Sequence, residues 1–188
     1  MEIILASGSP RRRELLGLCC PDFRVEVSGA DERVDEVLSP EELVARLAEK
    51  KAAEVAAHFP EAVVIGSDTV VELDGEILGK PHDPDEAASM LRRLSGREHR
   101  GHTAVQILSP LGSRSLVSTA EVSFAPMTDR EIDWYVSTGE PMDKAGAYGI
   151  QGYACRYITG IRGDYYTVMG LPVQQLYCAL RDLGILTD

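Results

Sequence analysis

The chain has 188 residues, enough for one domain or for two lobes that share a core, and 44% of them are hydrophobic, which allows a sizeable core. Its formal net charge of −11 argues against broad binding to nucleic acids or anionic membranes. Since the sequence has no apolar run long enough to span a bilayer and no signal-peptide pattern, we expect a cytoplasmic protein. The four cysteines show no C-x-x-C spacing and are expected to be reduced core residues.

The first predicted strand, 3–5, leads through a small polar turn into a predicted helix. Ser9 is a natural N-cap, Pro10 suits the first helical position, and Gly17 stands where a C-cap glycine would. Three consecutive arginines, 11–13, begin this helix, although the helix dipole disfavours cations there. Two interpretations stay open: the guanidinium groups bind a polyphosphate, or the helix is an ordinary capped helix with solvated arginines.

Residues 23–27 alternate in polarity and predict a short strand, after which an acidic loop spans 31–36. Most of this loop is expected to be solvated, and one or two of its carboxylates could hold a metal ion. A capping box at Ser39-Pro40-Glu41-Glu42 predicts the start of the next helix. Lys51 interrupts the apolar stripe of that helix, so its side chain either snorkels to solvent or reaches a functional site, whereas Lys50 points elsewhere.

The most strand-like run of the chain, 62–66, predicts a central strand. Asp68 and Thr69 follow this run and are expected at its carboxyl end, where open α/β sheets bind ligands. Asp74-Gly75 between two apolar runs predicts a two-residue hairpin turn. Continued pairing from that turn would bring Lys80 beside Asp68 and Thr69, either as a structural ion pair or as part of a site.

Capping signals at Asp83 and Thr128 predict two more helices, and Leu171-Pro172 opens a last one. The segment 140–152 contains three glycines together with lysine, aspartate and glutamine, which predicts a loop whose backbone a ligand can approach closely. The remaining predicted strands are 103–108, 116–124 and 154–159. Because strands and helices mix without strict alternation, we expect an α+β or mixed α/β fold.

Five short motifs occur in order along the chain: Ser7-Gly8-Ser9-Pro10-Arg11-Arg12, Gly66-Ser67-Asp68-Thr69-Val70, Leu78-Gly79-Lys80-Pro81, Asp143-Lys144-Ala145-Gly146-Ala147-Tyr148-Gly149-Ile150-Gln151-Gly152 and Gly163-Asp164-Tyr165-Tyr166. Together they resemble the Maf family of septum-formation-inhibitor-like nucleoside triphosphate pyrophosphatases. The resemblance covers essentially the whole chain and implies one Maf-like domain over 1–188. The Asp-Thr pair and the Tyr-Gly-Ile-Gln-Gly loop are similar to the branch that acts on dTTP and UTP.

The resemblance implies hydrolysis between the α and β phosphates, which yields a nucleoside monophosphate and pyrophosphate and uses a divalent metal, Mg²⁺ or Mn²⁺. It implies an elongated mixed β-sheet flanked by helices, with two lobes and a deep central cleft, as in inosine-triphosphatase-like proteins. Modified pyrimidine nucleotides are further candidate substrates. The implied cellular role is house-cleaning of nucleotide pools, with a link to septum formation and division arrest.

Residue by residue, the resemblance implies that Asp68 is the proton acceptor, and our reading of the residues leaves open whether it instead holds the metal. Glu32 matches the family's acidic-loop position, for which Asp31 and Glu36 are close rivals. The lysines that match the phosphate-contacting, catalytic set are Lys51 and Lys80. The positions that match substrate binding are Ser7 and Arg12 for the phosphates, and Arg11, Thr69 and Gln151 for selectivity.

Three alternatives remain: a non-catalytic nucleotide-binding regulator of septation, a nucleotidyl transferase, and the specificity of the branch that acts on 7-methyl-GTP. Intact Asp68, Lys80 and Arg11 favour turnover, and the lack of a recognisable acceptor site disfavours nucleotidyl transfer. The expected partner is a nucleoside triphosphate, with pyrimidines favoured, and neither nucleic acid nor a membrane. We expect a homodimer, since isologous dimers are the commonest assembly.

Overall fold

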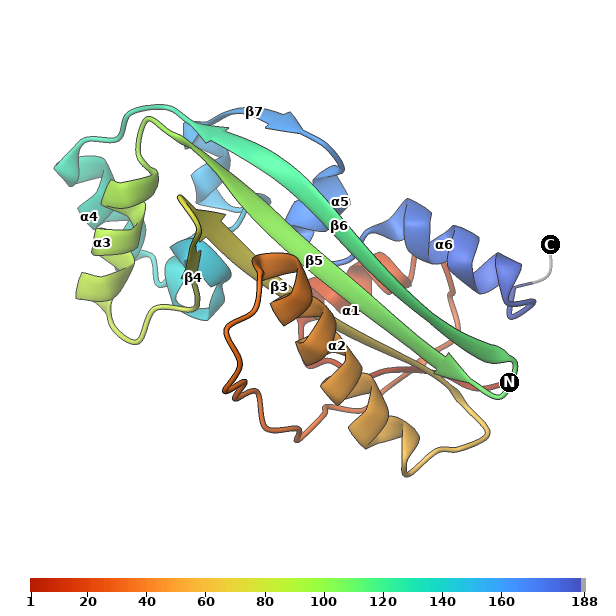
Figure 1. The fold of residues 1–188 in the computed structure, drawn as a ribbon. Coiled ribbons are helices and arrows are strands. Elements are labelled where there is room, and N and C mark those ends of the chain that lie inside the picture. Colours follow the sequence, from red (N-terminus) through yellow and green to blue (C-terminus); the bar gives the residue numbers. More distant parts are fainter. Residues whose placement is uncertain (187–188) are drawn as a thin grey trace. The chain divides into compact units, whose positions relative to one another are not determined.

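The computed structural model describes residues 1–186 as a mixed β-sheet with helices (Figure 1), which confirms the predicted fold class. The strands are β1 (Ile3–Leu5), β2 (Arg24–Val25), β3 (Val63–Leu73), β4 (Glu76–Leu78), β5 (Glu98–Ser109), β6 (Gly112–Phe124) and β7 (Ile158–Arg162). Within the described residues these seven strands form one sheet of order β2-β1-β3-β5-β6-β7, and β4 pairs with β3 off this path. The pairs of β1 with β2 and β3 are parallel, whereas β3–β4 and β6–β7 are antiparallel.

The α-helices are α1 (Pro10–Leu16), α2 (Pro40–Ala56), α3 (Pro84–Leu94), α4 (Asp129–Ser137), α5 (Tyr165–Met169) and α6 (Val173–Asp182). Three 3₁₀-helices follow α4: η1 (Glu140–Asp143), η2 (Ala145–Ala147) and η3 (Tyr153–Tyr157). The predicted N-caps form: Ser9, Ser39, Asp83 and Thr128 each accept a hydrogen bond from a backbone amide of the first helical turn. No helix in the described part of the chain is both long and apolar enough to cross a membrane.

The chain divides into two compact units. Unit 1 comprises Met1–Asp68, Thr103–Ser118 and the residues from Gly170 onward, and unit 2 comprises Thr69–His102 and Thr119–Met169. In unit 1 a small apolar cluster joins β1, α2 and β3, and its members are Ile4, Ala6, Ala52, Val55, Ala62 and Val64. The single domain over 1–188 and the central cleft stay predictions.

The predicted hairpin forms in unit 2, with Leu73 opposite Glu76. Asp74 and Gly75 both have positive φ, 55° and 84°, as a tight turn of this hand requires. The ladder then stops at the pair Val71–Leu78, so the predicted pairing of Thr69 with Lys80 is wrong. One residue beyond Leu78, the carbonyl of Gly79 accepts a hydrogen bond from the amide of Gly146, a residue distant in the sequence, at 3.0 Å.

Two other expectations about strands are wrong. β3 does not end before Asp68 but continues to Leu73, because the apolar run resumes directly after the polar residues 67–69. The segment 154–159 begins as the 3₁₀-helix η3 rather than as a strand. Its buried residues Ala154 and Tyr157 are three positions apart, the spacing of a 3₁₀-helix and not of a strand.

The cysteines are all free, as expected, but they are not all core residues: Cys20 is buried, whereas Cys155 is exposed. Gly17 stands at the C-cap of α1 with φ of −59°, a right-handed conformation in which the special freedom of glycine is not used.

The core of unit 2 contains an uncharged histidine. His99 of β5 is buried, and its Nε2 lies 2.7 Å from the hydroxyl of Tyr148. Its ring packs edge-on against Phe124 and Tyr148, with centroids 5.1 and 5.2 Å away. Burial lowers the pKa of His99 from 6.5 to about 4, so the imidazole is neutral near pH 7.

We expect the free energy of unfolding to fall with acidification. The reason is that His99 takes up a proton at a higher pH in the unfolded chain than in the folded protein. A lowered folded-state pKa contributes stability above about pH 6.5, and this contribution, up to about 3 kcal/mol, is lost between about pH 6.5 and pH 4. Urea unfolding of His99→Gln across this range should show a flatter pH dependence. The exposed His58 supplies the control, since His58→Gln should keep the slope of the unmodified protein.

Candidate active site

The turn between β1 and α1 places two serines and an arginine together. The Ser9 hydroxyl accepts from the Arg12 amide at 3.4 Å, which caps α1. The buried Ser7 hydroxyl lies 3.3 Å from the Ser9 amide and 3.3 Å from Arg12 Nη1. Ser7 therefore links the backbone of the turn to the guanidinium group, and two of the predicted phosphate-binding residues are in direct contact.

The guanidinium of Arg12 is fixed from its other side by the chain segment that precedes α6. Arg12 Nε donates to the carbonyl oxygen of Gly170 at 2.9 Å, and the hydroxyl of Ser67 donates to the same oxygen at 3.1 Å. Burial lowers the pKa of Arg12, while the negative charge of Asp68 opposes that effect. Arg12 is thus a preorientated cation near a carboxylate, which suits the binding of a phosphate group.

Helix α2 lies against the backbone of β3 at a glycine. A Cβ at Gly66 would come within 2.5 Å of the Ala48 carbonyl oxygen and 2.7 Å of the Ala52 amide. Since side chains alternate along a strand, Asp68 shares the face of Gly66 that α2 covers. Because α2 approaches β3 this closely at Ala52, the preceding residue Lys51 lies next to Asp68.

Lys51 stands between two carboxylates. Its Nζ lies 2.5 Å from Asp68 Oδ1 and 2.9 Å from Glu32 Oε1. The side chains of Lys51 and Asp68 are only 13% and 12% exposed, so the pair is largely shielded from water. The predicted helical phase is confirmed, because the neighbouring Lys50 instead donates to the backbone carbonyl of Arg33 at 2.7 Å.

The sequence left three candidates for the acidic-loop position, Asp31, Glu32 and Glu36, and of these Glu32 pairs with Lys51. Asp31 pairs with Arg33 at 2.9 Å, and Glu36 lies 3.7 Å from Arg46. Sequence reasoning could not separate these neighbours, since a loop has no fixed side-chain period.

Two carboxylates, Glu32 and Asp68, are the residues that could hold a metal ion. Among the residues described, no group of three or more His, Cys, Asp and Glu is arranged to bind a metal ion. Glu32 and Asp68 nevertheless converge on one cation, the ammonium of Lys51. Mg²⁺ is commonly bound by one or two carboxylates, with water and substrate phosphates completing its shell. Two carboxylates that already share a cation match that pattern.

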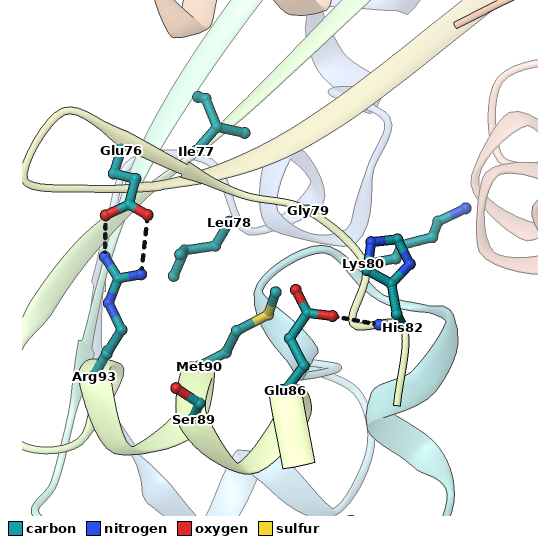
Figure 2. Close-up of a pocket in the computed structure, with 10 residues that line it drawn as sticks. All are labelled: Glu76, Ile77, Leu78, Gly79, Lys80, His82, Glu86, Ser89, Met90 and Arg93. Carbon is teal, nitrogen blue, oxygen red and sulfur yellow. Dashed lines mark hydrogen bonds and ion pairs between the residues drawn. The ribbon is translucent and has the colours of Figure 1, made fainter. Parts of the chain in front are cut away.

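Three predicted site residues belong to unit 2: Thr69 in β3, Lys80 after β4, and Gln151 in a turn after η2. Lys80 borders a hollow of about 300 Å³ between β4 and α3 (Figure 2). Inside it Glu86 accepts a hydrogen bond from the His82 amide at 2.6 Å, and Arg93 forms an ion pair with Glu76, also at 2.6 Å. In Figure 2 the Lys80 side chain points away from that pair, so the hollow is not built as an anion site.

Sequence reasoning missed the Gly170 carbonyl, which accepts from Arg12, and the Ser67 hydroxyl, which donates to the same carbonyl. The Gly170 carbonyl accepts through the backbone, which every residue type possesses, so the sequence gives no signal for this contact. Ser67 lies within the Gly-Ser-Asp-Thr motif, so its sequence position offered a signal that we did not use.

The fold is that of a known class of proteins. Two solved Ham1 protein structures match it: one from Staphylococcus aureus, with a TM-score of 0.55 and 15% identity, and one from Coxiella burnetii, with a TM-score of 0.51 and 14% identity. Each match covers 97% of this chain and 99% of the other. At such low identity the likeness shows the fold alone.

A family model described as "Maf-like protein" matches residues 2–183, and the chain belongs to this family, as its motifs predicted. The dTTP/UTP pyrophosphatase of Bacillus velezensis is 51% identical over 183 residues, which cover 97% of each chain. The dTTP/UTP pyrophosphatase of Symbiobacterium thermophilum is 51% identical over 185 residues, 97% of this chain and 94% of the relative.

Substitution of Gly66 tests the contact that seats Lys51. Gly66→Ala places a methyl group against helix backbone that cannot rotate away, so we expect the free energy of unfolding to fall by about 1–3 kcal/mol. Urea denaturation measures this change. Gly29→Ala is the matched control in unit 1, since a Cβ there meets nothing within 4 Å and stability should change little.

Proposed function

We propose that this protein is a nucleoside triphosphate pyrophosphatase that hydrolyses dTTP and UTP to the nucleoside monophosphate and pyrophosphate. The observation that carries the proposal is the contact of Lys51 with both Asp68 and Glu32, beside the fixed guanidinium of Arg12. Support for the substrate comes from the two relatives at 51% identity, both of which are dTTP/UTP pyrophosphatases.

In the proposed reaction a water oxygen forms a bond to the α-phosphorus, and the bond from that phosphorus to the α–β bridging oxygen breaks. Pyrophosphate leaves with the bridging oxygen, and Asp68 accepts the proton of the attacking water. Lys51 and Arg12 supply positive charge to the phosphate oxygens as the transition state develops. A divalent cation held by Glu32 and Asp68, Mg²⁺ or Mn²⁺, would further neutralise the phosphate charge.

The other motif residues recognise the substrate in this proposed function. Ser7 orients Arg12 and contacts phosphate, and Lys80 provides a further cation. Arg11, Thr69 and Gln151 select the substrate. Gln151 offers both a donor and an acceptor, which matches the edge of uracil or thymine. We further propose that the protein prefers pyrimidine nucleotides, forms a homodimer and works in the cytoplasm.

Pyrophosphate release decides between turnover and mere binding. We expect dTTP and UTP with Mg²⁺ or Mn²⁺ to yield pyrophosphate, and excess EDTA to stop the release. Asp68→Asn serves as the control protein, because it keeps the shape of the side chain but loses the proton-accepting charge. It should bind dTTP and release no pyrophosphate. Orthophosphate as the product, or full activity in EDTA, would contradict the proposal, and no turnover by either protein would favour the non-catalytic regulator.

A pair of adjacent lysines tests the site itself. Lys51→Ala removes a cation that contacts Asp68 and Glu32, and kcat/KM for dTTP should fall by about 100- to 1,000-fold, the usual loss for one transition-state donor. Lys50→Ala removes only contacts to the backbone of the acidic loop and should retain most activity. Steady-state kinetics on both variants checks the assignment, and the reverse order of effects would refute it.

A further inference from the structure

A turn in unit 2 carries Gln151 and is closed by its own backbone. The Gly152 amide donates to the Gly149 carbonyl at 3.1 Å, so Gly149–Gly152 is a four-residue turn, called here the Gln151 turn. Ile150 is 8% exposed and anchors the turn in the protein, whereas Gln151 is exposed. The turn thus presents the glutamine side chain outward.

Two side chains that the proposed chemistry does not use hold this turn from both ends. The Gly149 amide donates to the hydroxyl of Tyr135 at 3.1 Å, and the Tyr153 amide donates to Glu140 Oε2 at 3.0 Å. The Tyr135 hydroxyl in turn donates to Glu140 Oε1 at 2.7 Å. Tyr135 and Glu140 therefore connect Gly149, the first residue of the turn, to Tyr153, the residue that follows the turn, through one chain of hydrogen bonds. We call these two residues the turn clamp.

The directions of these hydrogen bonds are fixed by chemistry. Burial raises the pKa of Tyr135, and the hydrogen bond to Glu140 raises it further, so the hydroxyl keeps its proton. That proton goes to Glu140, and the hydroxyl oxygen is left to accept from the Gly149 amide. Both carboxylate oxygens of Glu140 are used, one for the tyrosine and one for the Tyr153 amide.

The carboxylate also packs directly on the backbone of the turn. A Cβ at Gly152 would clash with both carboxylate oxygens of Glu140, and a Cβ at Gly149 would lie 2.5 Å from Lys144 Cε. Lys144 itself donates to the backbone carbonyl of Glu140 at 2.7 Å. The two glycines thus admit Glu140 and Lys144 to positions that a side chain on the turn would fill.

We propose that Tyr135 and Glu140 are positioning residues that fix the Gln151 turn and thereby set how strongly the protein discriminates between nucleotide bases. This inference rests on the proposed function, in which Gln151 reads the base. The Gln151 amide discriminates between bases only while it is held in place. A wrong base is then rejected because it leaves the amide without a hydrogen-bond partner, and a turn that can move away removes this penalty. The clamp supplies that constraint without touching the substrate.

The kinetic test compares three variants with one matched control. Glu140→Ala and Tyr135→Phe each break the clamp, and Glu140→Gln keeps an acceptor for the Tyr153 amide. The control is Glu131→Ala: the Glu131 carboxylate also accepts two hydrogen bonds, from the Thr128 amide at 2.8 Å and hydroxyl at 2.7 Å. It belongs to α4, the helix that carries Tyr135, and it contacts no residue of the Gln151 turn through these bonds.

We expect the ratio of kcat/KM for dTTP to that for GTP to fall about tenfold in Glu140→Ala and in Tyr135→Phe. Glu140→Gln should recover most of the ratio. Glu131→Ala should lower Tm through the lost helix cap and leave the ratio unchanged. An equal loss for both nucleotides in the clamp variants, or the same change of ratio in Glu131→Ala, would overturn the inference.

Amide hydrogen exchange tests the clamp without any turnover. Exchange of the Gly149 and Tyr153 amides should become faster in Glu140→Ala and stay unchanged in Glu131→Ala. Unchanged exchange in Glu140→Ala would show that the clamp does not hold the turn. If the unmodified protein releases no pyrophosphate, the proposed function fails, and the exchange experiment still decides whether the clamp exists.

Discussion

The closeness of α2 to β3 at Gly66 is the constraint on which the candidate site depends. Helix backbone meets strand backbone there, with the small residues Ala48 and Ala52 at the contact. A lysine on the inner face of such a helix has little room to reach solvent, and its charge would be costly if unpaired. Asp68 and Glu32 offset that cost, so packing and electrostatics together determine where the ammonium of Lys51 lies.

The charge distribution explains how an acidic chain could accept an even more acidic substrate. The net charge of −11 repels a nucleoside triphosphate at long range, so binding needs local cations whose positions are already fixed. Arg12 is held by Ser7 and by the Gly170 carbonyl, and Lys51 is held by two carboxylates. Such cations need little reorganisation when phosphate arrives, which is the condition for strong transition-state stabilisation.

The features that could be predicted from the sequence are those formed by residues close together in the chain. Side-chain caps and the Asp74-Gly75 turn involve residues within four positions of one another, and they formed as expected. The inward phase of Lys51 followed from helical periodicity alone. Contacts over long sequence separations were different: the Gly170 carbonyl bonds Arg12 from 158 residues away, and no local pattern encodes that partner. Polar residues at 67–69 resembled the end of a strand, yet β3 continues because the apolar run resumes beyond them.

Glycine serves close approach at two places in this protein, with different physical consequences. At Gly66 the neighbouring atoms belong to helix backbone, which cannot yield without moving α2, so the glycine supports the fold and the site together. At Gly152 the neighbouring atoms are the carboxylate of Glu140, at the end of a flexible side chain that can rotate away. A larger residue there would displace the carboxylate and so break the turn clamp, although Gly152 itself has φ of −98°, outside the left-handed region that favours glycine. A substitution of Gly152 therefore acts on the Gln151 turn with little effect on the stability of the fold, whereas a substitution of Gly66 affects the fold and the site together.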